Sequence, residues 1–136
     1  MIDSDVFAAK RILDNGYSCV FCYKGMVFTS KKEGVLPLID FINSKCDFST
    51  FSAAVNLISV SNALLFVKLN IKEISTYVLT KNAKAIFDEF KVDYKYNELI
   101  DDNNITDINL KKCDKLIDEI NDFNLKVEKI MEIEAV

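Results

Sequence analysis

The longest apolar stretch of the chain, residues 51–69, constrains the fold more than any other segment because its side chains require burial. Six polar residues interrupt the stretch, which is too many for a membrane span and typical of a globular core. Its apolar residues occupy most of a helical circumference, which predicts one long, central, buried helix that runs to about Lys68. Ser49 or Thr50 is expected to cap the N-terminus of that helix.

The segments before this stretch predict a helix followed by a hairpin. Apolar residues at helical spacing over residues 2–13 stop at Gly16, and residues 17–23 are typical of a strand that is covered on both faces. Lys24-Gly25 predicts a tight turn into a second strand over residues 26–30. Pro37 then suits the first turn of a short helix.

The segments after the stretch alternate between strand and helix. Strands are expected over residues 71–79 and 92–96, and Thr80 is expected to cap the helix between them. A helical stripe starts at Leu110 and has a break near residues 121–124. This order predicts an α/β fold: one domain over residues 1–136, a three-layer α/β/α sandwich with a mixed sheet.

Composition limits the partners that this chain is expected to have. The formal net charge is −4 and no basic stripe is present, so we expect no nucleic-acid binding. The acidic N-terminus is unlike a signal peptide, and no segment is typical of a membrane span. The four cysteines are then expected to be reduced thiols in a cytoplasmic protein.

The chain contains no histidine, and this excludes several classes of enzyme together. Most catalytic zinc sites use at least one imidazole, and so do Ser-His and Cys-His nucleophile pairs. Cys19 and Cys22 form a Cys-x-x-Cys, but residues three apart on a strand point to opposite faces and cannot converge on one metal ion. We therefore expect no metal site and no cofactor.

Polar residues inside the apolar stretch are either hydrogen-bonded in the core or line a ligand cavity. These residues are Asn56, Ser59, Ser61 and Asn62. Internal hydrogen bonding is the favoured interpretation. A second polar segment, the loop over residues 103–107, leads into a helix whose N-terminus could face an anion.

Three segments of the chain resemble signatures of one family. Residues 31–42 resemble a Gly-Val-x-Pro-Leu-Leu-Asp signature, residues 53–74 resemble a central helix and its following strand, and residues 92–100 resemble a Tyr-x-Glu-Leu-Val strand end. Together they span nearly the whole chain and resemble the uncharacterised family called domain of unknown function 1893 (DUF1893). The resemblance implies a cytidine deaminase-like fold.

The resemblance also implies a missing zinc cage. Ordinary members of that superfamily bind zinc through a His- or Cys-x-Glu pair that opens one helix and a Pro-Cys-x-x-Cys that opens the next. The corresponding helix starts are placed near residues 48–54 and 109–114, and neither contains such a motif. The family's polar loop corresponds to residues 104–114, which keep Asn104, Thr106 and Asp114 but lack its glycines, arginine and proline.

Two further family positions differ in this chain. An Asp of the central helix corresponds to Asn56, and a following Gly-Lys pair corresponds to Val60-Ser61. Cys113 lies within a residue or two of the family's cysteine. Any chemistry that the family performs is therefore not expected to carry over unchanged.

The leading hypothesis is a non-catalytic module on a deaminase-like scaffold that binds a nucleoside-like or anionic small molecule. Its pocket is predicted at the starts of the central and last helices, where hydroxyls and helix N-termini meet. The predicted lining residues are Ser49, Thr50, Asn56, Ser61, Asn104 and Thr106.

Two alternatives stay open. The first is a metal-independent enzyme that uses Cys113 or Cys46, with a thiol pKa lowered by a helix N-terminus or by Lys111 or Lys112. The second is a structural protein or one that forms a homo-oligomer.

Overall fold

A computed structural model describes residues 4–135 and contains one mixed sheet of five strands. The strands are β1 (Cys19–Tyr23), β2 (Met26–Ser30), β3 (Ser52–Ile58), β4 (Glu73–Thr80) and β5 (Tyr94–Ile100). Their order across the sheet is β2-β1-β3-β4-β5. Strand β1 is antiparallel to both neighbours, whereas β3, β4 and β5 run parallel. The predicted mixed α/β fold is confirmed.

Six α-helices surround the sheet within the part of the chain that is described. They are α1 (Asp5–Leu13), α2 (Leu36–Asn43), α3 (Val60–Leu69), α4 (Lys81–Glu89), α5 (Ile108–Ile117) and α6 (Phe123–Met131). Two short 3-10 helices, η1 (Asp102–Asn104) and η2 (Glu132–Ala135), follow β5 and α6.

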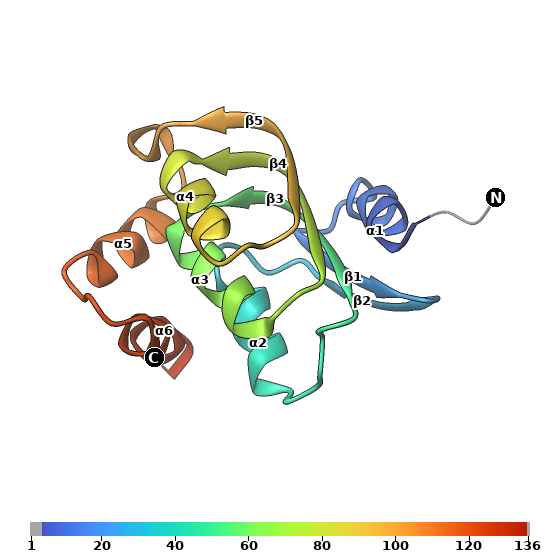
Figure 1. Ribbon diagram of the computed structural model, residues 1–136, viewed down its shortest axis with the longest axis horizontal. Helices are drawn as coiled ribbons and strands as arrows, with labels where there is room; N and C mark the ends of the chain where they lie inside the picture. The colour runs from blue at the N-terminus through green and yellow to red at the C-terminus, as the bar shows by residue number, and fades with distance from the viewer. Residues whose placement is uncertain (1–3, 136) are drawn as a thin grey trace.

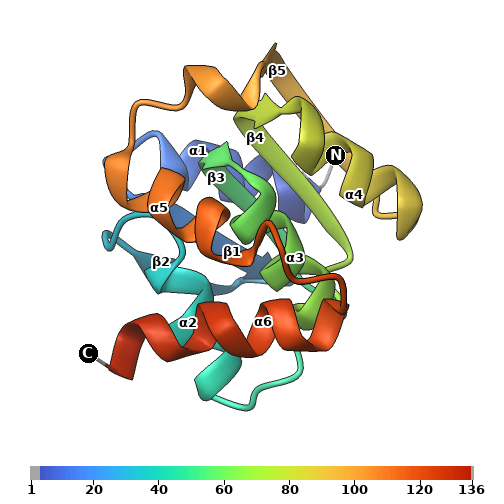
Figure 2. The same cartoon turned by 90° about the vertical axis from the view of Figure 1, so that its left-hand side faces the viewer.

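The helices form two layers of unequal size on either side of the sheet. Helix α1 lies alone on one face, against β1, β3 and β4 (Figure 1). The other five helices lie on the opposite face, where α3 is central and α5 and α6 pack on it as the outermost helices (Figure 2). The burial of β1 on both faces follows from this arrangement.

The predicted long helix over residues 49–68 is wrong. Residues 52–58 form β3 in the middle of the sheet, and helix α3 starts only after Ser59. Ala53 and Val55 of β3 face the larger core, and Ala54 faces the smaller core beneath α1. A strand that is buried on both faces has no polar alternation, so its sequence is indistinguishable from a buried helix. Ser49 and Thr50 therefore cap no helix, and the family position at Asn56 lies on a strand.

The local signals elsewhere predict the structure well. Lys24 and Gly25 both have positive φ, as a two-residue hairpin turn requires. The Thr80 hydroxyl accepts a hydrogen bond from the backbone N–H of Ala83 and caps α4. The predicted break near residues 121–124 is confirmed, because α6 starts anew after its N-cap Asp122. The predicted start of the first helix at Ile2 lies outside the described residues.

Strand β5 lies two residues later than predicted and is longer. It pairs with β4 from Tyr94 as far as Ile100. Its side chains are mostly exposed because it is an edge strand, so apolar patterning does not mark it.

Aromatic rings fill the larger core. Phe21 stacks on Phe41 with ring centroids 4.3 Å apart and meets Phe48 edge-on at 5.1 Å. Phe28 and Phe51 extend this cluster toward β2. Such ring pairs add about 0.5–1.5 kcal/mol each beyond their buried area.

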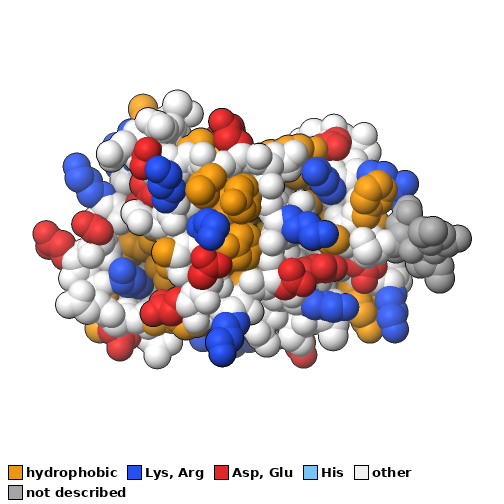
Figure 3. Space-filling model, turned by 45° about the horizontal axis from the view of Figure 1, so that its top comes forward, with side chains coloured by type: hydrophobic (Ala, Val, Ile, Leu, Met, Phe, Trp, Pro, Cys, Tyr) orange, Lys and Arg blue, Asp and Glu red, His pale blue; other side chains and the backbone are white. Residues whose placement is uncertain are grey.

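The surface carries mixed charge. On the face that includes β5, lysine, aspartate and glutamate side chains are interspersed around a small group of exposed hydrophobic side chains (Figure 3). Of the helices that are described, none is both long and apolar enough to cross a bilayer.

Candidate functional site

The parallel strands end at one edge of the sheet, and three helices start there or nearby. Helix α3 follows β3 directly, helix α4 follows β4, and η1 and α5 follow β5. In open α/β sheets, ligands bind in the crevice outside the carboxyl ends of the strands. The residues at this edge are therefore the candidate site.

The N-terminus of α3 is closed by a carboxylate from α5. Asp114 Oδ1 accepts hydrogen bonds from the Ser61 backbone N–H at 3.0 Å, the Ser61 hydroxyl at 2.5 Å and the Ser59 hydroxyl at 3.0 Å. Both serines are fully buried. Burial raises the pKa of Asp114, and the hydrogen bonds from Ser61 and Ser59 oppose that rise.

Asn62 connects the same helix start to the segment that precedes α2. Its Oδ1 accepts from the Ser59 backbone N–H at 3.0 Å, and its Nδ2 donates to the Gly34 carbonyl oxygen at 3.0 Å. No buried side-chain nitrogen or oxygen in the described part of the chain lacks a hydrogen-bond partner. Ser59, Ser61 and Asn62 thus form internal hydrogen bonds, as the favoured interpretation of the polar residues predicts.

Two further aspartates close the other helix starts at this edge. Asp102 Oδ1 accepts from the Asn82 backbone N–H at 3.1 Å in the first turn of α4. Asp107 Oδ1 accepts from the Leu110 backbone N–H at 3.0 Å and caps α5. The N-termini of α3, α4 and α5 therefore already hold carboxylates of the protein, which is the position that an anionic ligand was expected to take.

Two of the cavities that open at this edge adjoin each other. The larger, of about 610 Å³, lies between residues 31–36 and helix α5, and its apolar wall includes Leu36, Leu110 and Leu116. The smaller, of about 150 Å³, lies at the end of β3 and includes Asn56. Lys32, Glu33, Gly34, Asp107 and Leu110 line both cavities.

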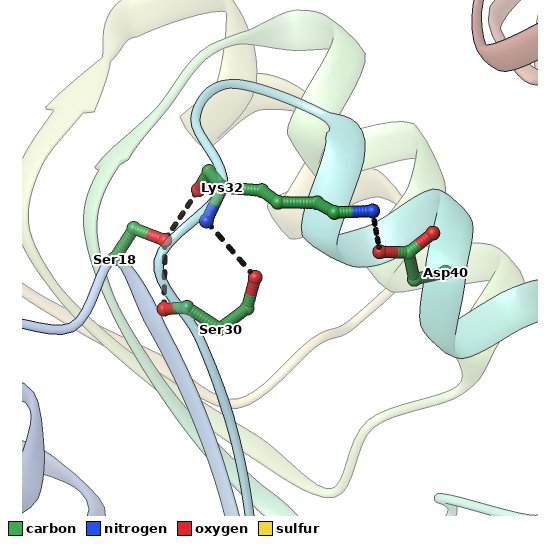
Figure 4. Close-up of polar contacts among 4 residues, drawn as sticks. All are labelled: Ser18, Ser30, Lys32 and Asp40. Carbon is green, nitrogen blue, oxygen red and sulfur yellow. Dashed lines mark hydrogen bonds and ion pairs between the residues drawn. The ribbon is translucent and has the colours of Figure 1, made fainter.

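Hydrogen bonds hold the wall formed by residues 31–34 in place. The Ser18 hydroxyl donates to the carbonyl oxygens of Ser30, at 2.9 Å, and of Lys32 (Figure 4). The Lys32 backbone N–H donates to the Ser30 hydroxyl at 3.1 Å, and the Lys32 ammonium pairs with Asp40 of α2 at 2.7 Å. The cavity wall is thus tied to Ser18, which precedes β1, and to β2 and α2.

The structure places the predicted lining residues in different parts of the molecule. Asn56 lies at the end of β3, lines the smaller cavity and donates to the Tyr17 carbonyl oxygen at 3.4 Å. Ser61 is buried against Asp114. Ser49 lies beside Asn70 at the C-terminal end of α3, and Thr50 is its neighbour in sequence.

Asn104 and Thr106 line neither cavity. Asn104 belongs to η1, and Thr106 lies in the connection to α5. Sequence reasoning missed Asp102, Asp107 and Asp114 as helix caps. For Asp107 a signal existed, because an aspartate immediately before a helical stripe is a favoured N-cap.

The cysteines are all unpaired and lie apart. Cys19 belongs to the larger core and Cys22 to the smaller core on the opposite face, which confirms that the two thiols do not converge. Cys113 lines the larger cavity, and burial raises its pKa. Cys46 is exposed. Within residues 4–135, no three cysteine, aspartate or glutamate side chains are grouped as ligands for a metal ion.

Comparison with known proteins identifies the relatives of this chain. A family model described as "Domain of unknown function (DUF1893)" matches residues 7–131. The crystal structure of a DUF1893 family protein (TM1506) from Thermotoga maritima, at 2.70 Å resolution, matches with a TM-score of 0.81 and 18% sequence identity. The match covers 98% of this chain and 92% of the Thermotoga chain. No curated protein matches the sequence. The chain therefore belongs to the DUF1893 family.

Proposed function

We propose that this DUF1893 protein is a non-catalytic module that binds a nucleoside-like small molecule in the larger cavity. The observation that carries the proposal is the cavity of about 610 Å³ between residues 31–36 and helix α5. Small-molecule sites commonly have volumes of about 300–1,000 Å³ and a mainly apolar lining with a few polar groups.

The apolar part of the cavity lining supports a ligand with a flat ring. Leu36, Leu110 and Leu116 offer apolar surface to the faces of a ring. Asn109 lines the larger cavity and Asn56 the smaller one. Each carboxamide both donates and accepts hydrogen bonds, which matches the mixed edge of a nucleobase.

The helix caps argue against an anionic ligand at the helix starts. Asp107 and Asp114 already accept from the backbone N–H groups that an anion would use at α5 and α3. A phosphate there would meet these carboxylates at close range and be repelled. We therefore favour the nucleoside-like ligand over the anionic one.

We also assign the fold to the cytidine deaminase-like superfamily, on the basis of the family resemblance, the mixed sheet and the helix layers on both faces. The zinc-binding helix starts were expected near residues 48–54 and 109–114, but residues 52–58 form β3, and the helices that follow β3 and β4 start at Ser59-Val60-Ser61 and Thr80-Lys81-Asn82. Neither contains the imidazole or thiolate that binds zinc in ordinary members. The side chains at these helix starts therefore support ligand binding without zinc-dependent deamination.

The four unpaired cysteines support a cytoplasmic location.

A thermal-shift screen with nucleosides, free bases and nucleotides tests the binding proposal. A ligand at about a hundred times its Kd stabilises the folded state by about 2.7 kcal/mol, which raises the Tm of a domain of this size by several degrees. Neutral nucleosides should give larger shifts than their monophosphates. Unchanged Tm across the whole panel would contradict the proposal.

Two matched variants locate the site. Leu116→Trp places bulk at the cavity wall and should abolish the ligand-induced shift. Leu125 is 55% exposed, like Leu116 at 54%, but lies on α6 away from the cavity. Leu125→Trp should therefore keep the shift, and equal loss in both variants would place the ligand elsewhere.

A further inference from the structure

The two edge strands of the sheet differ in how they are protected. Strand β5, at one edge, carries Lys95 and Glu98. Strand β2, at the other, reads Met26-Val27-Phe28-Thr29-Ser30 and contains no charge and no proline. Charged residues and proline are the usual devices that keep an exposed edge from pairing with another strand. Strand β2 lacks both.

The hairpin turn determines which backbone groups of β2 face outward. In the two-residue turn at Lys24-Gly25, Tyr23 and Met26 form the closing hydrogen-bonded pair. Hydrogen-bonded and non-hydrogen-bonded pairs then alternate along an antiparallel ladder. Phe28 therefore bonds to β1, whereas the N–H and C=O groups of Val27 and Thr29 point to the open edge.

The side chains at this edge are apolar and exposed. Met26, Val27 and Phe28 are 52%, 44% and 37% exposed, although Phe28 also contacts the aromatic core, with its ring 5.5 Å from that of Phe48. Met26 and Phe28 point to one face of the sheet and Val27 to the other, because side chains alternate along a strand. The edge therefore offers both unpaired backbone groups and apolar surface.

We propose that β2 is a self-association edge, at which a second copy of this chain pairs antiparallel about a two-fold axis at Val27. This inference is independent of the small-molecule site. A residue whose backbone N–H and C=O groups face the open edge can bond only to such a residue of the second copy. The symmetric registers near the middle of β2 therefore place the two-fold axis at Val27, at Phe28 or at Thr29. The side chains discriminate among these three.

The register centred on Val27 is the most complementary. It places Met26 opposite Phe28 of the second copy, Val27 opposite Val27, and Lys24 opposite Ser30. The register centred on Phe28 places Lys24 opposite Lys32, and like charges directly opposite destabilise a sheet. The register centred on Thr29 places Val27 and Met26 opposite Lys31 and Lys32. Pairing about Val27 continues one sheet through both copies and covers the exposed apolar side chains.

Sedimentation across about 1 µM to about 1 mM, a range suited to small interfaces, tests the proposal. The expected species has twice the monomer mass of 15.5 kDa at the upper concentrations. A monomer at every concentration overturns the proposal, and so does open-ended assembly without a dimer plateau.

Substitutions at Val27 test the edge and its register. Val27→Pro removes an outward N–H but no hydrogen bond to β1, and should weaken the dimer about tenfold or more. Val27→Lys and Val27→Glu each place like charges across the axis and should give monomers, whereas an equimolar mixture of the two should restore the dimer. A control, Tyr96→Lys on β5, should leave the dimer unchanged.

Failure of the mixture to restore the dimer overturns the register centred on Val27. A dimer that survives both Val27→Lys and Val27→Pro overturns the assignment of β2 as the self-association edge. Circular dichroism checks that each variant is folded.

Discussion

The carboxylate of Asp114 accepts both the backbone N–H and the hydroxyl of Ser61, at 3.0 and 2.5 Å, across 53 positions of sequence. A half-buried carboxylate thus closes the N-terminus of the central helix α3. The same contact fixes helix α5, whose side chains form a wall of the larger cavity. The contacts of Asp114 therefore contribute both to stability and to the shape of the candidate site.

Asp114→Ala should destabilise the protein by about 1–3 kcal/mol, because buried donors at Ser59 and Ser61 lose their acceptor. The measurement is the free energy of unfolding from urea denaturation. Asp118→Ala is the control, since Asp118 lies on the surface one turn further along. Its effect should stay within about 0.5 kcal/mol. Equal effects of the two substitutions would contradict the structural role of Asp114.

The stability of the wild type should depend on pH through Asp114. Burial raises the pKa of this carboxyl in the folded state, so the folded protein binds its proton more tightly than the unfolded chain. Stability from this group is fully present below the ordinary aspartate pKa of about 4 and is lost as pH rises through the folded-state pKa. Asp114→Asn cannot titrate and should lack this loss. The test is the urea midpoint of the wild type and of Asp114→Asn, measured across that pH range. A wild type that gains stability relative to Asp114→Asn as pH rises would contradict the prediction.

The thiols should differ in reactivity according to burial. Cys46 is exposed, whereas Cys19, Cys22 and Cys113 are buried and burial raises their pKa values. Iodoacetamide should label Cys46 first, and the other three about a hundred times more slowly, since they require local opening. Peptide mass spectrometry follows each site. Cys46→Ser should remove the fast phase, and rapid labelling of Cys113 would instead favour a thiol-dependent enzyme.

The hairpin turn should be improved by Lys24→Asn. Lys24 has φ of 45°, in the left-handed region that costs most L-residues about 1–2 kcal/mol and that asparagine tolerates better. We expect a gain of about 0.5–1 kcal/mol in the free energy of unfolding. Gly25→Ala is the opposing test: no atom lies within 4 Å of the added Cβ, so its cost should come from the backbone at φ of 85° alone. A neutral effect of both substitutions would mean that the turn is not formed in solution.

Local sequence signals determined those parts of the fold that depend on neighbouring residues. The Lys24-Gly25 turn, the Thr80 cap and the break before Asp122 follow from side chains that act within a few positions. The opposition of Cys19 and Cys22 follows in the same way, from the alternation of side chains along a strand.

Only the tertiary structure decided that residues 52–58 form the central strand. Their apolar sequence is compatible with a buried helix or a buried strand, and the choice comes from pairing with β1 and β4, which lie far away in sequence. The candidate site depends on similar long-range contacts. Asp114 meets Ser61 only because α5 packs on α3, and the cavity exists only because residues 31–36 lie opposite α5. A periodic pattern records which residues are buried, but the free energy that selects their partners is a property of the packed molecule.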